Sequence, residues 1–273
     1  MAAWESLAEE TERGFGWLCE GLDRDTPVTF VPNPGNIGDA LINLGCYRYL
    51  AQRFSSIAIC SAYDEPTTEV VFIAGGGNLI EPLYATIADL VNDRCGGRQL
   101  RFFPSSVKGY DGLLDSIAGR TRMLCREPVS FAHVARHLPA ASVRLGHDAA
   151  FAVAPPIRAA FAAGMAVFPR TAARFFRDDV ERAQNKAGDG DLMTREGGTW
   201  VDLGAAERAV AETAAVLVQY GRVYTDRLHC AILAAMLDRY VVMVANSYYK
   251  NRAVFDHSLS RFANVRFDDG SVG

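Results

Sequence analysis

Residues 225–229, Thr-Asp-Arg-Leu-His, bring together an acid, a guanidinium and an imidazole directly after a predicted strand. We expect Thr225 or Asp226 to cap the helix that follows, which places Arg227 and His229 in its first turn. Cations there oppose the helix dipole, so two of them indicate that an anion binds between them. Such a setting suits His229 as a general acid. The alternative is a structural histidine, because the apolar residues 230–233 bury the next turn.

A second candidate segment is residues 33–39, Asn-Pro-Gly-Asn-Ile-Gly-Asp. Its two glycines allow a tight turn, and the helix that follows offers its first backbone amides to an anion or a hydroxyl. Asp39 is a candidate base. It could equally be an acidic residue that the helix dipole favours at this end.

A third segment, residues 74–79, contains three consecutive glycines followed by Asn78. Glycines contribute no side chain to packing, but they permit positive φ and leave backbone amides exposed. We therefore expect this loop to face a ligand.

A fourth segment places Arg126 at the end of a strand and just ahead of a helix. Arginine binds carboxylate and phosphate groups in a bidentate fork, which suits a small anionic ligand. Pairing with Glu127 is the alternative, in which case the two residues form only an ion pair.

The elements that must position these segments alternate between short apolar strands and helical patterns, which predicts parallel sheets covered by helices on both faces. Expected strands are 28–31, 56–60, 70–74, 100–103, 123–125, 143–145, 165–168, 222–224 and 240–245. Expected helices are 2–22, 39–53, 80–92, 112–118, 128–137, 205–220 and 228–237, with 178–204 as a loop.

The Ala-Pro-Pro-Ile stretch at 154–157 interrupts this alternation and is predicted to be a linker. The expected architecture is α/β, with two Rossmann-like doubly wound domains, 1–154 and 155–273, that face a cleft. Ligands of such sheets bind beyond the carboxyl ends of the strands. The helix over 2–22 is expected to dock on the protein, with a membrane-facing role as the alternative.

Composition limits the function classes. The formal net charge of -4 gives no basic field for nucleic acid. Six cysteines are scattered singly, mostly in apolar runs, which favours a reducing cytoplasm. No secretory signal is expected, and no apolar run reaches the ~18 residues that span a bilayer. We expect at most peripheral contact with the inner face of a membrane.

The order of these segments resembles the polysaccharide pyruvyl transferase family. Residues 35–39 are similar to its opening turn, 75–79 to its glycine-rich loop, and 103–107 to its Pro-Gln-Ser loop, with Ser105 where Gln is usual. Further similar segments are Arg126-Glu127 with Ser130, residues 146–151, residues 225–229 and residues 246–251. The resemblance runs from about residue 30 to 257.

The resemblance implies a GT-B-like fold, phosphoenolpyruvate as donor, and a sugar of an exopolysaccharide or cell-surface glycan as acceptor, which could be lipid-linked. It also implies that the C-terminal half carries the donor side and that no cofactor is needed. The expected catalytic residues are His229, Asp226 and Asp39. The expected substrate-binding residues are Arg126, Arg227, Leu228, Gly75, Gly76, Gly77, Asn78, Asn36, Ser105 and Lys250.

In the expected mechanism, Arg126 and Arg227 hold the donor while His229 protonates the enol methylene carbon. A sugar hydroxyl then attacks, phosphate leaves, and a second hydroxyl closes a cyclic ketal. Asp39, Asp148 and Asp226 are the candidate bases. No metal is expected, since the His and acidic residues show no familiar ligand spacing. The alternatives are a GT-B glycosyltransferase that uses a nucleotide sugar and an inactive, glycan-binding relative.

Overall fold

The computed structural model describes residues 2–166, 170–179, 181, 188–194 and 198–269. Its strands are β1 (Val28–Val31), β2 (Ile57–Ile59), β3 (Val70–Ile73), β4 (Gly76–Ile80), β5 (Gln99–Lys108), β6 (Thr121–Cys125), β7 (Val143–Leu145), β8 (Arg170–Phe175), β9 (Tyr220–Thr225), β10 (Tyr240–Val244) and β11 (Val265–Asp268). Its α-helices are α1 (Ala3–Leu18), α2 (Ile37–Arg53), α3 (Thr86–Arg94), α4 (Asp111–Ile117), α5 (Pro128–Val134), α6 (Ala154–Met165), α7 (Leu203–Leu217), α8 (Leu228–Met236) and α9 (Lys250–His257). Short 3-10 turns η1 (Ala118–Arg120), η2 (Ala140–Ser142), η3 (Ala149–Val153) and η4 (Leu259–Arg261) complete the described elements.

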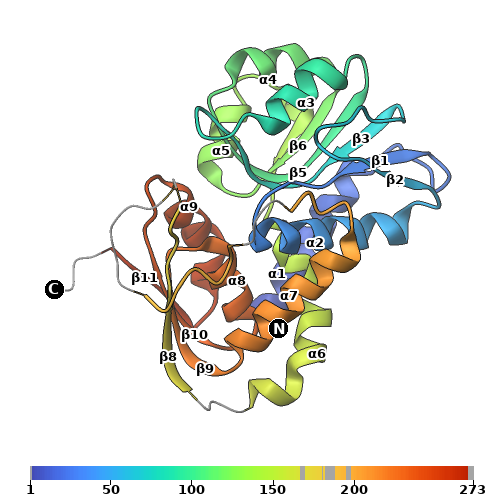
Figure 1. The fold of residues 1–273 in the computed structure, drawn as a ribbon. Helices are drawn as coiled ribbons and strands as arrows, with labels where there is room; N and C mark the ends of the chain where they lie inside the picture. The colour runs from blue at the N-terminus through green and yellow to red at the C-terminus, as the bar shows by residue number, and fades with distance from the viewer. Residues whose placement is uncertain (1, 167–169, 180, 182–187, 195–197, 270–273) are drawn as a thin grey trace.

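The strands form two parallel sheets, as the alternation of strands and helices predicts. The larger sheet has seven strands in the order β2-β1-β3-β5-β6-β7, with β4 paired to the second half of β5. The smaller has four strands in the order β11-β10-β9-β8. The two sheets occupy opposite ends of the molecule (Figure 1).

Helices cover both faces of the larger sheet. Helices α3, α4 and α5 share one apolar core with it, and α1 and α2 share another core on the opposite face. Helix α2 also contributes Ile37, Ala40 and Leu41 to a core shared with α7 and α8. Because α2 is apolar on more than one side, it joins the two parts of the chain (Figure 1).

Helix α1 is docked, as expected, but it ends at Leu18 rather than at residue 22. Its side chains Leu7, Phe15 and Leu18 are fully buried. No helix in the described part of the chain has the length and apolarity needed to cross a membrane.

The predicted linker at 154–157 is wrong, because these residues begin helix α6. Prolines fit the first turn of a helix, where the backbone N–H has no intrahelical partner to lose. The predicted strand at 165–168 is also wrong at its start, since Met165 ends α6. Residues 167 and 168 lie outside the described residues, and the first described strand of the second sheet is β8.

Two predicted loops are strands. The glycine-rich segment forms β4 from Gly76 onward, and residues 103–107 lie inside β5. The two strands pair with each other, so part of the glycine-rich backbone is used for strand pairing and is not free for a ligand. The predicted helix at 80–92 therefore starts later, at Thr86. The described parts of 178–202 contain no helix or strand beyond isolated bridges, as the loop prediction expects.

Candidate active site

A cavity of about 530 Å³ opens where the carboxyl ends of strands from both sheets meet. From the larger sheet it is lined by Pro34, Gly35, Asn36, Asp39, Tyr63, Gly77, Asn78, Tyr84, Thr86 and Arg126. From the rest of the chain it is lined by Arg177, Asp179, Glu181, Met193, Gly198, Thr199, Arg227, Leu228, His229 and Lys250. Nine of the thirteen residues expected from the sequence are therefore brought together here: Asn36, Asp39, Gly77, Asn78, Arg126, Arg227, Leu228, His229 and Lys250.

Arg126 follows β6 and is held by two hydrogen bonds from its guanidinium. Nε donates to Ser106 Oγ (2.9 Å) and Nη1 donates to Asp148 Oδ2 (2.7 Å). The third nitrogen, Nη2, lies beside Gly77, where a Cβ would approach it to 3.4 Å. Since Nε and Nη1 are fixed from behind, Nη2 is the atom that Arg126 offers to the cavity.

Glu127 does not pair with Arg126. Its carboxylate caps α5 by accepting hydrogen bonds from the backbone N–H groups of Val129 (2.7 Å) and Ser130 (3.0 Å). The partner of Arg126 is Asp148, which is fully buried after β7. Arg126 therefore does form an ion pair, but its partner is Asp148 and not Glu127.

His229 lies in the first turn of α8 with its imidazole at the cavity wall. Its Nε2 is 3.4 Å from Oδ2 of Asp148, the same oxygen that accepts from Arg126. Burial by itself would raise the pKa of Asp148, but the charges of His229 and Arg126 lower it well below the usual range. Asp148 is therefore an anion that faces His229 from inside the protein.

Asp39 lies on the cavity side of α2, in the third position of the helix. It forms a capping box with Asn36: Asp39 Oδ2 accepts from Asn36 N (3.0 Å), and Asn36 Oδ1 accepts from Gly38 N (2.7 Å). Burial raises the pKa of Asp39 to about 6, although the charges of His229 and Lys250 oppose the shift. The residue is thus both a helix cap and a carboxyl group that titrates near neutral pH.

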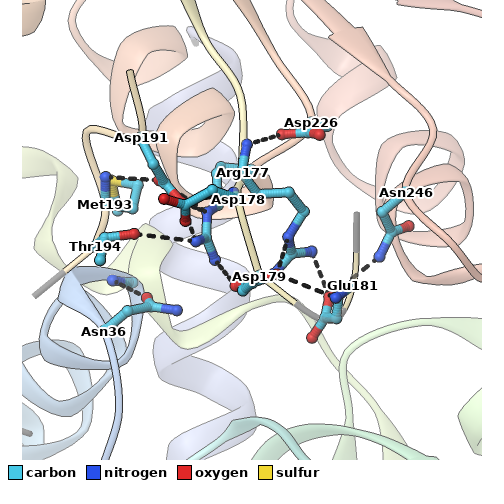
Figure 2. A network of polar contacts seen from close by, with 12 residues as sticks. Asn36, Arg177, Asp178, Asp179, Glu181, Asp191, Met193, Thr194, Asp226 and Asn246 are labelled. Carbon is cyan, nitrogen blue, oxygen red and sulfur yellow. Dashed lines mark hydrogen bonds and ion pairs between the residues drawn. The ribbon is translucent and has the colours of Figure 1, made fainter. Parts of the chain in front are cut away.

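Glu181 lines the cavity and contacts three polar side chains. It accepts from Lys250 Nζ (2.6 Å) and from the Tyr84 hydroxyl (2.7 Å), and it forms an ion pair with Arg177. Burial lowers the pKa of Lys250 to about 8, although Glu181 opposes the shift. This cluster connects Tyr84, which lies between β4 and α3, with Lys250 at the start of α9. Figure 2 shows Glu181 beside Arg177.

Arg227 lines the cavity but is already held by two acids, Asp191 and Asp179, both of which Figure 2 labels. Nε donates to Asp191 Oδ1 (3.0 Å), and Nη1 forms an ion pair with Asp179 Oδ2 (2.7 Å). The Asp191 side chain is 3% exposed and that of Asp179 is 35% exposed. The expected cap is absent, because Arg227 itself occupies the N-cap position without a side-chain hydrogen bond.

Four expected site residues lie outside the cavity lining, because their atoms serve the fold. Gly75 packs so closely on β5 that a Cβ would meet Pro104 O at 2.3 Å. Gly76 has φ +120° and lies against Asn33. Ser105 donates to Phe103 O (2.9 Å) within β5. Asp226, one of the three candidate bases, accepts from the backbone N–H of Arg177 (2.8 Å).

Seven polar residues of the cavity were not expected from the sequence: Tyr63, Tyr84, Thr86, Arg177, Asp179, Glu181 and Thr199. Arg177 follows the end of β8 just as Arg227 follows β9. The rule that sites lie beyond strand ends would have found it, had the strand been placed at 170–175 instead of 165–168.

The model of the polysaccharide pyruvyl transferase family matches residues 36–248. Among solved structures, the chain is similar to an uncharacterized protein from Klebsiella pneumoniae subsp. pneumoniae, with 26% identity and a TM-score of 0.80. That similarity covers 95% of this chain and 98% of the other. No curated protein matches the chain.

Proposed function

Because the chain belongs to the polysaccharide pyruvyl transferase family, we propose that it transfers a pyruvyl group from phosphoenolpyruvate to two hydroxyls of a glycan sugar. The products are a cyclic pyruvate ketal and inorganic phosphate. The observation that carries this proposal is His229, an imidazole at the cavity wall backed by the buried anion Asp148. An imidazolium held in this way can deliver a proton to a bound substrate.

In this proposal the donor lies between His229 and the guanidinium of Arg126. Nη2 of Arg126 and Nζ of Lys250 both lie near Gly77, where a Cβ would approach them to 3.4 and 3.7 Å. These cations bind the carboxylate and phosphate by charge-assisted hydrogen bonds. Arg227 adds its Nη1, since the more exposed Asp179 can give way to the donor while Asp191 keeps the rest of the guanidinium in place.

The reaction begins when His229 protonates the methylene carbon of the enol, which places positive character on the neighbouring carbon. One sugar hydroxyl attacks that carbon and loses its proton, and the C–O bond to phosphate breaks. The second hydroxyl then forms the other C–O bond of the ketal. Of the two hydroxyl protons, one replaces the proton that His229 gave and the other leaves with phosphate.

Asp39 accepts a hydroxyl proton in this scheme. Its pKa of about 6 leaves it mostly ionised at neutral pH and still able to hold a proton. Asp226 has no such role, because its carboxylate faces the backbone of Arg177.

We further propose that the two parallel sheets correspond to the two halves of a GT-B arrangement. Residues 1–154 form the acceptor side and contribute Arg126, and residues 155–273 form the donor side. The acceptor would be a sugar of an exopolysaccharide or cell-surface glycan, in the cytoplasm or on a lipid carrier at the inner face of the membrane.

Calorimetry with phosphoenolpyruvate tests the donor. We expect micromolar to millimolar binding that Arg227→Ala weakens, and that Arg174→Ala on the exposed side of β8 leaves unchanged. Incubation with candidate glycans should release phosphate in proportion to ketal formed. Binding of a nucleotide sugar and release of its nucleoside diphosphate, with no phosphoenolpyruvate binding, would instead identify a glycosyltransferase.

A further inference from the structure

A cluster of two histidines and two aspartates lies on the outer side of the larger sheet, between α4 and α5. Asp111 and Asp115 are one turn apart on α4. His133 is in the last turn of α5, and His137 is in the turn that follows this helix. None of the four lines the cavity. Both helices pack on the same face of the sheet (Figure 1). Asp111 contacts both histidines from the neighbouring helix.

The spacing of the polar atoms fits the ligands of a tetrahedral metal ion. Oδ1 of Asp111 is 3.4 Å from Nε2 of His133 and 3.5 Å from Nε2 of His137. One ligand atom from each residue lies within 4.8 Å of the others. Zinc bonds of about 2.0–2.2 Å place neighbouring ligand atoms of a tetrahedron about 3.3–3.6 Å apart.

The hydrogen bond between His137 and Asp115 makes the other contact of His137, with Asp111, unfavourable in the absence of a cation. Nδ1 of His137 lies 2.9 Å from Oδ1 of Asp115, and since a carboxylate only accepts, Nδ1 carries the proton. In the neutral ring Nε2 then carries a lone pair, and this lone pair faces the Asp111 oxygen. Two acceptors that face each other at 3.5 Å require a cation between them or a second proton on the ring.

Asp115 also supplies the outer contact that metal-bound histidines usually have. A ligating imidazole donates its other N–H to a carboxylate or carbonyl, which fixes the ring orientation and the tautomer. The Asp115–His137 bond is of this kind and is formed without any metal. Both imidazoles are mostly buried, with 14% and 15% of their side chains exposed, so their positions are defined by packing.

We propose that Asp111, His133 and His137 bind a divalent transition-metal ion of the zinc type and thereby link α4 to α5. Two imidazoles and one carboxylate form a donor set suited to zinc. The fourth position is open to water or to the carbonyl of Gly109, which is 3.0 Å from Nε2 of His133. None of the three residues lines the cavity, so the site is structural.

Metal binding requires one local change at His133. Its Nδ1 now accepts from Arg136 Nη2 (2.8 Å), so the proton is on Nε2 and points to Gly109 O. When Nε2 binds the metal, the ring proton moves to Nδ1 and the exposed Arg136 side chain turns away. Arg136 therefore competes with the metal, and its removal is expected to leave metal binding intact or to strengthen it.

Zinc and cobalt titrations of the full, tag-free, chelator-treated chain test the proposal. We expect one Zn²⁺ per chain by calorimetry and visible d–d bands of tetrahedral Co²⁺. His137→Ala should weaken binding by about 100-fold or more. Asp115→Ala should weaken it by about 10–100-fold, because it orients a ligand without touching the metal.

Two control variants separate this site from unspecific binding. Arg136→Ala should bind zinc at least as tightly as the wild type, and Asp93→Ala, an exposed carboxylate on α3, should not change the affinity. Far-UV circular dichroism of His137→Ala should match the wild type, so that lost binding is not lost folding. An absence of Zn²⁺ binding would overturn the proposal. So would binding that His137→Ala leaves unchanged, or cobalt–thiolate charge-transfer bands, which would place the metal on a cysteine.

Discussion

Nε2 of His229 and Oδ2 of Asp148 lie 3.4 Å apart, and the same oxygen accepts a hydrogen bond from Arg126 at 2.7 Å. One buried carboxylate thus organises the candidate acid and a candidate donor-binding cation. The residues come from the ends of β9, β7 and β6, in both sheets.

Asp148→Asn should lower turnover by about 100-fold or more, because it removes the anion that faces His229. It should also destabilise the protein by about 3–5 kcal/mol, since Arg126 is left buried and unpaired. Urea unfolding and single-turnover kinetics measure the two effects. As a control, Asp256→Asn breaks the solvent-exposed pair with Arg252 and should leave the stability nearly unchanged. Equal stability losses in the two variants would contradict the prediction.

Asp39 should make the protein less stable as the pH rises from about 4 to 6. Its pKa is raised by burial to about 6, so in this range the folded state holds a proton that the unfolded state has lost. The free energy of unfolding should therefore fall by about 3 kcal/mol, at about 1.4 kcal/mol per pKa unit. Asp39→Asn should lack this contribution. Urea midpoints of both proteins between pH 4 and 8 give the comparison, and parallel curves would rule out the shift.

Lys250 should make donor binding weaken above about pH 8. Its pKa is lowered by burial from 10.5 to about 8, so the folded protein loses this cation about 2.5 pH units below a free lysine. By the same linkage, the shift makes stability rise between about pH 8 and 10.5, where the unfolded chain holds the extra proton. Calorimetry with phosphoenolpyruvate should show affinity falling by up to about tenfold per pH unit. Lys250→Arg, which stays charged, should remove this pH dependence.

Substitution by alanine should have different effects at the neighbouring residues Gly76 and Gly77. Gly76→Ala should destabilise the protein by about 1–3 kcal/mol, because the residue has φ +120° and a Cβ would lie 2.9 Å from Asn33. Gly77→Ala should fold but bind the donor more weakly, because its Cβ would stand 3.4 Å from Nη2 of Arg126. Melting temperatures and donor affinities of the two variants decide the matter. A Gly77→Ala variant with unchanged affinity would show that the donor does not approach Arg126 from this side.

The residues that gather in the cavity were largely predictable because parallel strands end at a common edge. Asn36, Arg126 and His229 follow β1, β6 and β9, and each was found by that rule. Glycine patterns were less informative. Gly75 and Gly77 look alike in sequence, yet the first meets the backbone of Pro104 and the second meets Arg126.

Local sequence patterns specify the alternation of strands and helices, and with it the parallel sheets and the loops that carry the site. Apolar periodicity and helix signals are local, so they can be read from neighbouring residues. Tertiary structure decided the partners: Asp148 rather than Glu127 for Arg126, and Arg177 rather than the substrate for Asp226. It also brought Asp111 to His133 and His137. These contacts join residues far apart in the chain, and their geometry depends on how the helices pack on the sheets, which no local pattern encodes.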